Sequence, residues 1–119
     1  MATLQEVQNF LREFITKCNS RAEGIHFINR KENLKALSEL EITANERKDI
    51  VMQLKSEDYY RGPLQSSESP IWRDYWEFGK IVKGQEVYIK ISIGERNKST
   101  LCISFHIARH KIEYPYKNN

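Results

Sequence analysis

Two stretches in the second half of the chain alternate between apolar and polar residues, and they constrain the fold more than any other feature. In residues 87–93, Val or Ile stands at every odd position, while Tyr88, Lys90 and Ser92 stand between them. Residues 101–106 repeat the alternation, reading Leu101-Cys102-Ile103-Ser104-Phe105-His106. Successive side chains of a strand point to opposite faces of a sheet, so each stretch predicts a strand with one apolar and one polar face.

A third alternating run extends the predicted sheet towards the middle of the chain. Between Trp72 and Phe78 the apolar side is interrupted only by Asp74. We expect one antiparallel sheet with Ile89, Ile91, Ile103 and Phe105 buried, and with Val82-Lys83-Gly84-Gln85 as a hairpin turn. The opposite face would carry Arg73, Tyr88, Lys90 and His106. Such a face is either an ordinary solvated surface or a site for an anionic ligand, and the phenol, imidazole and two cations favour the second interpretation.

The first half of the chain has the periodicity of helices. Thr3–Glu6 and Thr43–Glu46 are capping boxes, which predict a helix over Leu4–Cys18 and another from residue 44 to near Lys55. Between them we expect a short strand at residues 25–28 and a helix capped by Asn29, running to Leu40. Its inward positions would be Leu34, Leu37 and Leu40. These elements predict a single domain over residues 1–119 with an α+β fold, in which the helices cover one face of the sheet.

Two segments are predicted to lack regular structure. Residues 61–70 contain two prolines, a glycine and three serines, which favours a long loop between the helices and the sheet. Residues 107–116 suit either a last edge strand or an extended tail.

Charge is distributed unevenly along the chain. Residues 1–70 hold ten Lys or Arg and eleven Asp or Glu, whereas residues 71–119 hold nine and five, so the predicted sheet carries the basic excess. This asymmetry points mildly to a polyanion such as nucleic acid as partner.

Several classes of site and location are disfavoured by what the sequence lacks. Cys18 and Cys102 stand alone in separate elements, without metal spacing or a disulfide framework, as is typical of reduced cysteines in a cytoplasmic protein. No glycine-rich phosphate loop and no apolar stretch long enough to span a membrane is present. We therefore expect no metal, no cofactor and no membrane contact.

The candidate reaction that remains is acid–base catalysis on a phosphodiester. RNA cleaves itself when its 2′-OH is deprotonated, the phosphate charge is stabilised and the leaving oxygen gains a proton. Arginine suits the phosphate, and histidine or a perturbed tyrosine suits proton transfer. The candidate residues are Arg61, Arg73, Tyr88, Lys90 and His106, with Tyr59, Tyr60 and Tyr75 as platforms for stacking bases or, equally, as partly buried core residues.

Four short motifs together resemble the MqsR family of bacterial toxins. They are Glu57-Asp58-Tyr59-Tyr60-Arg61, Ile71-Trp72-Arg73-Asp74, the run Lys83 to Ile91, and Ile103-Ser104-Phe105. Their order and spacing cover residues 24–106. The resemblance implies a RelE-like fold, an mRNA interferase activity and a cognate antitoxin protein as partner.

The family's active site implies roles for four positions. Its Lys, Gln, Tyr and second Lys fall on Arg61, Arg73, Tyr88 and His106, of which only Tyr88 is identical. We take these four as the candidate catalytic residues, with Lys90, Tyr60 and Tyr75 as substrate-binding residues and single-stranded mRNA as substrate. Which residue is the acid and which the base stays open. The alternatives are a non-catalytic RNA-binding or partner-binding module, and a toxin acting on DNA gyrase with the same fold.

Overall fold

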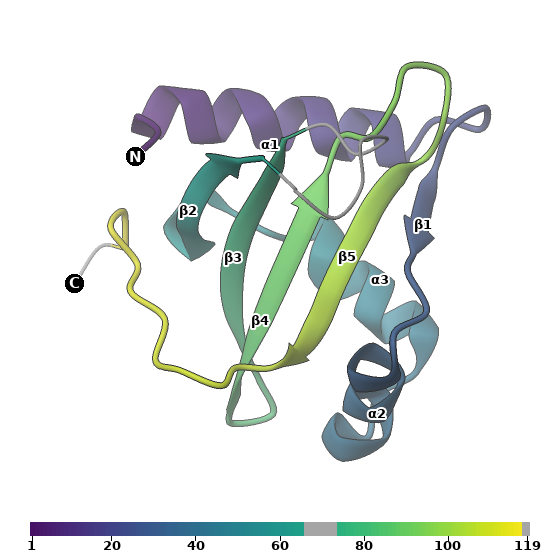
Figure 1. Cartoon of the computed structure of the whole chain (residues 1–119), viewed down its shortest axis with the longest axis vertical. Coiled ribbons are helices and arrows are strands. Elements are labelled where there is room, and N and C mark those ends of the chain that lie inside the picture. The colour runs from purple at the N-terminus through teal and green to yellow at the C-terminus, as the bar shows by residue number, and fades with distance from the viewer. Residues whose placement is uncertain (66–73, 118–119) are drawn as a thin grey trace.

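The computed structural model describes residues 1–65 and 74–117, in which helices cover one face of a five-stranded sheet (Figure 1). The order along the chain is α1 (Leu4–Cys18), β1 (Ile25–Phe27), α2 (Lys31–Leu40), α3 (Ala44–Met52), a 3₁₀ turn (Ser56–Asp58), β2 (Tyr59–Leu64), β3 (Tyr75–Val82), β4 (Gln85–Ser92) and β5 (Thr100–Ile107). In space the strands follow the order β1-β5-β4-β3-β2. The predicted α+β class is confirmed.

The central hairpin forms as the alternation predicts. β3 and β4 pair antiparallel from Tyr75–Ser92 to Val82–Gln85, with the turn at Lys83 and Gly84. Val87, Ile89 and Ile91 are completely buried, as predicted. They face the helices, and on α1 Phe10 stacks on Trp76 of β3 with ring centroids 4.3 Å apart.

Both predicted capping boxes are present, and α1 has the predicted bounds. The second helix differs from its prediction. Its N-cap is Arg30, not the predicted Asn29. Leu34 is 52% exposed, so the assignment of Leu34 to the core was wrong. The buried stripe of α2 instead consists of Asn33, Ala36 and Leu40, because the amide of Asn33 finds buried hydrogen-bond partners on β5.

The sheet is mixed, whereas an antiparallel sheet was predicted. β1 pairs parallel to β5, from Ile25–Thr100 to Phe27–Cys102. Directly after β1 the chain forms α2 and α3, which lie behind the sheet (Figure 1). The predicted loop over 61–70 was also wrong at its start, since residues 59–64 form edge strand β2. Proline is tolerated in an edge strand, so Pro63 does not prevent β2 from forming. Gly62 has a φ of 129° and lies against Trp76, and a Cβ on Gly62 would be 3.0 Å from the Cα of Trp76. Residues 66–73 lie outside the described residues, and they hold the rest of the predicted loop together with Trp72 and Arg73 from the start of the third alternating run.

A β-bulge in β5 changes which residues share a face. Lys90 pairs with Ser104 but Ile91 pairs with Cys102, so Ile103 is the extra residue. Cys102 therefore belongs to the core, not to the polar face on which strict alternation placed it, and Leu101 pairs with Ser92 instead. Ile103 and Phe105 remain buried, as predicted.

Asn33 of α2 stabilises the backbone at this bulge. Its Nδ2 donates to the carbonyl oxygens of Ile103 (2.9 Å) and Ile28 (3.0 Å), and its Oδ1 accepts from the backbone N–H of Phe105 (3.0 Å). One 2% exposed side chain thus provides partners for three backbone groups.

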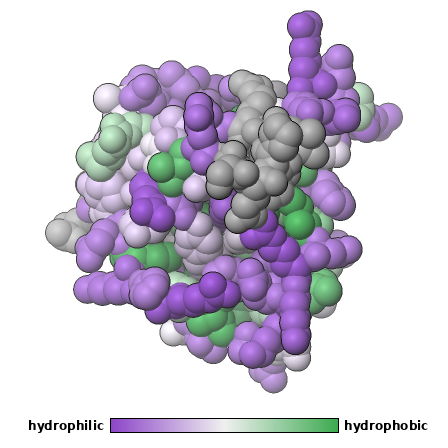
Figure 2. Space-filling model, in the orientation of Figure 1, coloured by the Kyte–Doolittle hydropathy of each residue, from purple (hydrophilic) through white to green (hydrophobic). Residues whose placement is uncertain are grey.

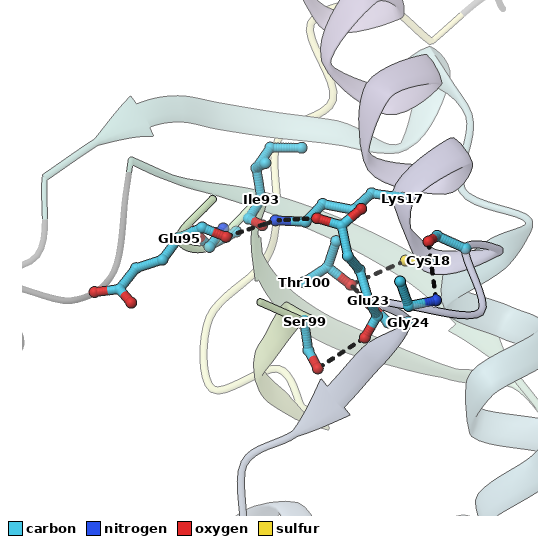
Figure 3. A network of polar contacts seen from close by, with 12 residues as sticks. Lys17, Cys18, Glu23, Gly24, Ile93, Glu95, Ser99 and Thr100 are labelled. Atoms are coloured by element: carbon cyan, nitrogen blue, oxygen red, sulfur yellow. Dashed lines mark hydrogen bonds and ion pairs between the residues drawn. The ribbon is translucent and has the colours of Figure 1, made fainter. Parts of the chain in front are cut away.

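A polar network at the opposite end of the sheet holds α1 and β1 against the β4–β5 connection (Figure 3). The Lys17 ammonium donates to the carbonyl oxygens of Ile93 (2.8 Å) and Glu95 (2.9 Å). Thr100 donates through both its N–H and its hydroxyl to Gly24 O, each at 2.9 Å. These contacts are structural and lie away from the polar face described below. Within the part of the chain that the structure describes, no helix is long and apolar enough to cross a membrane.

We predict that Asn33→Ala lowers the free energy of unfolding by about 2–4 kcal/mol, because it leaves buried backbone groups of β5 without partners. Urea denaturation at neutral pH measures the change. Asn45→Ala, at an exposed position of α3, is the matched control and should change stability by less than about 0.5 kcal/mol. Equal losses in the two variants would contradict the assigned role of Asn33.

Candidate functional site

Strand pairing brings polar side chains of four strands into adjacent rows on the face opposite the helices. One row runs Arg61, Glu77, Lys90 and Ser104 across β2, β3, β4 and β5. The neighbouring row runs Gly79, Tyr88 and His106. The prediction that Tyr88, Lys90 and His106 share a face is therefore confirmed.

The centre of this arrangement is Glu77, a residue that the sequence analysis did not select. Glu77 is only 3% exposed, and its carboxylate accepts hydrogen bonds from Arg61 Nε at one oxygen and from the Tyr88 hydroxyl at the other. The sequence signal was its position between Trp76 and Phe78, which places it on the polar face. Its importance depends on β2, which delivers Arg61, and that strand was not predicted.

Glu77 favours the protonated form of both partners. The pKa of Tyr88 is raised far above that of an ordinary phenol, mainly by burial and next by the hydrogen bond to Glu77. The hydrogen bond to Glu77 also raises the pKa of Arg61. At neutral pH Tyr88 is therefore an uncharged hydroxyl and Arg61 is a guanidinium. The Arg61 side chain is 58% exposed, and its two terminal nitrogens present four further N–H donors.

His106 lies beside Tyr88, with ring centroids 5.3 Å apart. Its Nδ1 is 3.0 Å from the carbonyl oxygen of Ile107, which can only accept a hydrogen bond. Nδ1 therefore carries a proton, and the neutral ring has its lone pair on Nε2. This tautomer gives His106 one nitrogen able to take up or return a proton.

Two of the predicted base-stacking tyrosines contact cations of the site instead. The Lys90 ammonium lies 4.0 Å from the ring centroid of Tyr75, and the Arg61 guanidinium lies 5.1 Å from that of Tyr60. Both tyrosines are half-buried. Tyr59 is completely buried in the core, so of the two alternatives it is a core residue and not a stacking platform. Its hydroxyl donates to Gly62 O inside β2.

These residues line a cleft of about 320 Å³. The cleft is positive, because its walls carry more cations than carboxylates. The lining residues with charge are the cations Arg30, Arg61, Lys90, Arg109 and Lys111 and the glutamates Glu32 and Glu77. The strands lie in front of α3 in Figure 1, and the same view in Figure 2 is mostly hydrophilic. The space is open to solvent and suits a charged polymer better than a small apolar ligand.

The cleft contains most of the predicted site residues. Tyr60, Arg61, Tyr88, Lys90 and His106 line it, whereas Tyr75 contributes through its contact with Lys90. Arg73 lies outside the described residues. Among the residues that are described, no cluster of three or more His, Cys, Asp or Glu could hold a metal ion.

Comparison with known proteins gives one match. A family model described as "Motility quorum-sensing regulator, toxin of MqsA" matches residues 4–107. No curated protein matches the chain. No solved structure matches it either.

The raised pKa of Tyr88 predicts how stability depends on pH. A phenol of the unfolded chain ionises near pH 10, whereas folded Tyr88 keeps its proton above that pH. The stability linked to this difference is present below pH 10 and is lost as pH rises further, by up to about 1.4 kcal/mol per pH unit. Denaturation followed from about pH 9 to about pH 11 should show a steeper loss in the wild type than in Tyr88→Phe. Tyr114→Phe should also flatten the curve, because the pKa of Tyr114 is raised too. An unchanged slope in Tyr88→Phe would contradict the assigned environment.

Proposed function

Because the chain belongs to the MqsR family of toxins, and is therefore the toxin of a toxin–antitoxin system, we propose that it is a metal-independent endoribonuclease. Its substrate is single-stranded mRNA in the cytoplasm, and its regulator is a cognate antitoxin protein. The helices packed on one face of a mixed sheet are consistent with a RelE-like fold.

One observation carries the proposal. A buried carboxylate, Glu77, holds Arg61 and Tyr88 next to the imidazole of His106 in a positive cleft. A phosphate-binding guanidinium, a fixed hydroxyl and a titratable nitrogen are the groups that RNA cleavage by its own 2′-OH requires.

The reaction transfers the phosphate within the RNA strand. The 2′-oxygen forms a bond to phosphorus and the bond from phosphorus to the 5′-oxygen breaks. The 2′-OH proton passes to a base and a proton from an acid passes to the leaving 5′-oxygen. The products are a 2′,3′-cyclic phosphate and a 5′-hydroxyl, so atoms and charge balance without an added reactant.

The described residues have roles that follow from their contacts, whereas the role of Arg73 rests on the sequence alone. Arg61, with Arg73 as a second arginine, would bind the non-bridging phosphate oxygens. Lys90 adds positive charge on the cleft wall. His106 Nε2 performs proton transfer. The Tyr88 hydroxyl donates its hydrogen bond to Glu77 and keeps its proton, so its oxygen lone pairs remain able to accept a hydrogen bond from the ribose and position the 2′-OH.

The same contacts favour a second candidate, a non-catalytic RNA-binding or partner-binding module. Arg61 and Tyr88 are both engaged by Glu77, an acceptor that the protein itself supplies. A protein of this kind would bind RNA in the cleft but leave it intact. Product analysis separates the two functions.

We predict that the purified protein cleaves single-stranded RNA in the presence of EDTA. The products should carry a 2′,3′-cyclic phosphate or 3′-phosphate and a 5′-hydroxyl, which mass spectrometry identifies. RNA with a 2′-O-methyl group at the scissile nucleotide should bind and stay intact. Cleavage that needs Mg²⁺, or that proceeds on a 2′-deoxy substrate, would refute the mechanism. Binding without any cleavage would support the non-catalytic module.

Two substitutions test the assigned roles. His106→Ala should lower kcat by about 10²- to 10⁴-fold, because it removes the proton-transfer group. His26→Ala, at an exposed position of β1, is the matched control and should leave kcat unchanged. Tyr88→Phe should lower kcat with little change in KM, because it removes positioning and not phosphate binding. A wild-type rate in His106→Ala would exclude His106 from the reaction.

A further inference from the structure

The segment after β5 forms one wall of the cleft, yet it lies beyond residue 107, where the family match ends. Residues 108–112 all line the cleft, together with Tyr60 and Arg61 of β2 and His106 of β5. Figure 1 shows this segment in yellow, running from the end of β5 back across the sheet towards β2.

The segment is fastened to β4 by one residue, Glu86, through its backbone carbonyl and its side chain. The backbone N–H of Ala108 donates to Glu86 O (2.9 Å) and that of Ile112 donates to Glu86 Oε1 (3.1 Å). The Tyr114 hydroxyl donates to the other carboxylate oxygen (2.8 Å). Residues 108–112 are therefore a loop closed at both ends on the same glutamate.

Gly79 of β3 provides the space in which the segment lies. A Cβ at this position would be 2.4 Å from Tyr114 Oη and 2.7 Å from Ile112 Cδ1. Gly79 pairs directly with Tyr88, so the segment rests on the sheet next to the candidate site. Further along, Tyr116 packs on Tyr59 with ring centroids 5.7 Å apart. The wall is thus a built part of the fold.

Between the two anchors the loop presents Arg109, His110 and Lys111 in succession, and all three are exposed. We call these residues the basic loop. Arg109 contacts Glu32 at 3.4 Å, but both side chains are largely exposed. Solvent-exposed ion pairs of this kind are weak, so a phosphate can displace Glu32.

We propose that the basic loop binds a backbone phosphate flanking the scissile one and so determines how a longer RNA lies in the cleft. This inference rests on the proposed function and extends it to a second subsite. Single-stranded RNA carries a negative charge at every nucleotide. When Arg61 holds one phosphate, the neighbouring phosphates extend along the cleft walls, where the basic loop supplies the cations on the β5 side.

The double variant Arg109→Gln/Lys111→Gln tests the subsite. The probe is a fully 2′-O-methylated single-stranded RNA of mixed sequence, which reports binding without cleavage. Affinity should fall roughly tenfold for each cation lost. The slope of log K against log salt should decrease in magnitude by about 0.7 for each lost phosphate contact. Cleavage of a dinucleotide, which has no flanking phosphate, should keep the wild-type rate.

The matched control is Arg12→Gln/Lys48→Gln, which removes one Arg and one Lys from exposed positions of α1 and α3. Neither residue lines the cleft. This variant should retain wild-type affinity and salt slope. Equal losses in the two double variants would show a general charge effect and overturn the subsite. Wild-type RNA binding in the basic-loop variant, with weakened binding of the antitoxin, would overturn it in favour of a protein contact.

A second variant displaces the wall without changing its charge. Gly79→Ala places a methyl group where Tyr114 and Ile112 lie, so the amide of Ile112 should exchange faster with solvent. RNA affinity should then fall as in the basic-loop variant. If exchange at Ile112 rises and affinity stays at the wild-type value, the subsite is refuted.

Failure of the wild type to bind RNA refutes the proposed function and the subsite together. If the wild type binds and cleaves RNA and the basic-loop variant has the same RNA affinity, only the subsite is refuted.

Discussion

The site depends on a carboxylate buried at the middle of the sheet. An ionised carboxylate removed from water is costly unless charged or polar donors satisfy it. Glu77 meets this requirement with the Arg61 guanidinium from β2 and the Tyr88 hydroxyl from β4. The need to stabilise one buried charge therefore fixes the positions of two functional groups on the strands either side.

The rest of the fold places His106 and the cleft walls around that centre. With the β-bulge at Ile103, Cys102 and Phe105 lie in the core, while Ser104 and His106 face the cleft. Asn33 provides hydrogen bonds for the backbone that the bulge leaves unpaired. On the other side, Gly79 admits the segment after β5. Each of these residues looks unremarkable in the sequence, and each is explained by a contact with a distant element.

Local patterns predicted the parts of this structure that local physics determines. The capping boxes and the alternation of residues 87–93 correctly predicted α1, α3, β4 and the face on which Tyr88 lies. Three features depend on tertiary contacts and were missed. β1 joins the sheet through β5, and β2 forms despite Gly62 and Pro63. On α2, Asn33 is buried, whereas Leu34, which the apolar stripe placed in the core, is exposed. The contact between Arg61 and Glu77 depends on the pairing of β2 with β3, so it could not be predicted without β2. Arg73, the other predicted arginine of the site, lies outside the described residues.

A crystal structure of the protein with a non-cleavable, 2′-O-methylated RNA tests the central claim most directly. The account predicts that the scissile phosphate contacts the terminal nitrogens of Arg61, that the modified 2′-oxygen lies within hydrogen-bond distance of Tyr88 or His106 Nε2, and that Glu77 still accepts from Tyr88. RNA bound on another face, or a cleft that stays empty at saturating RNA, would contradict the assignment of this cleft as the active site.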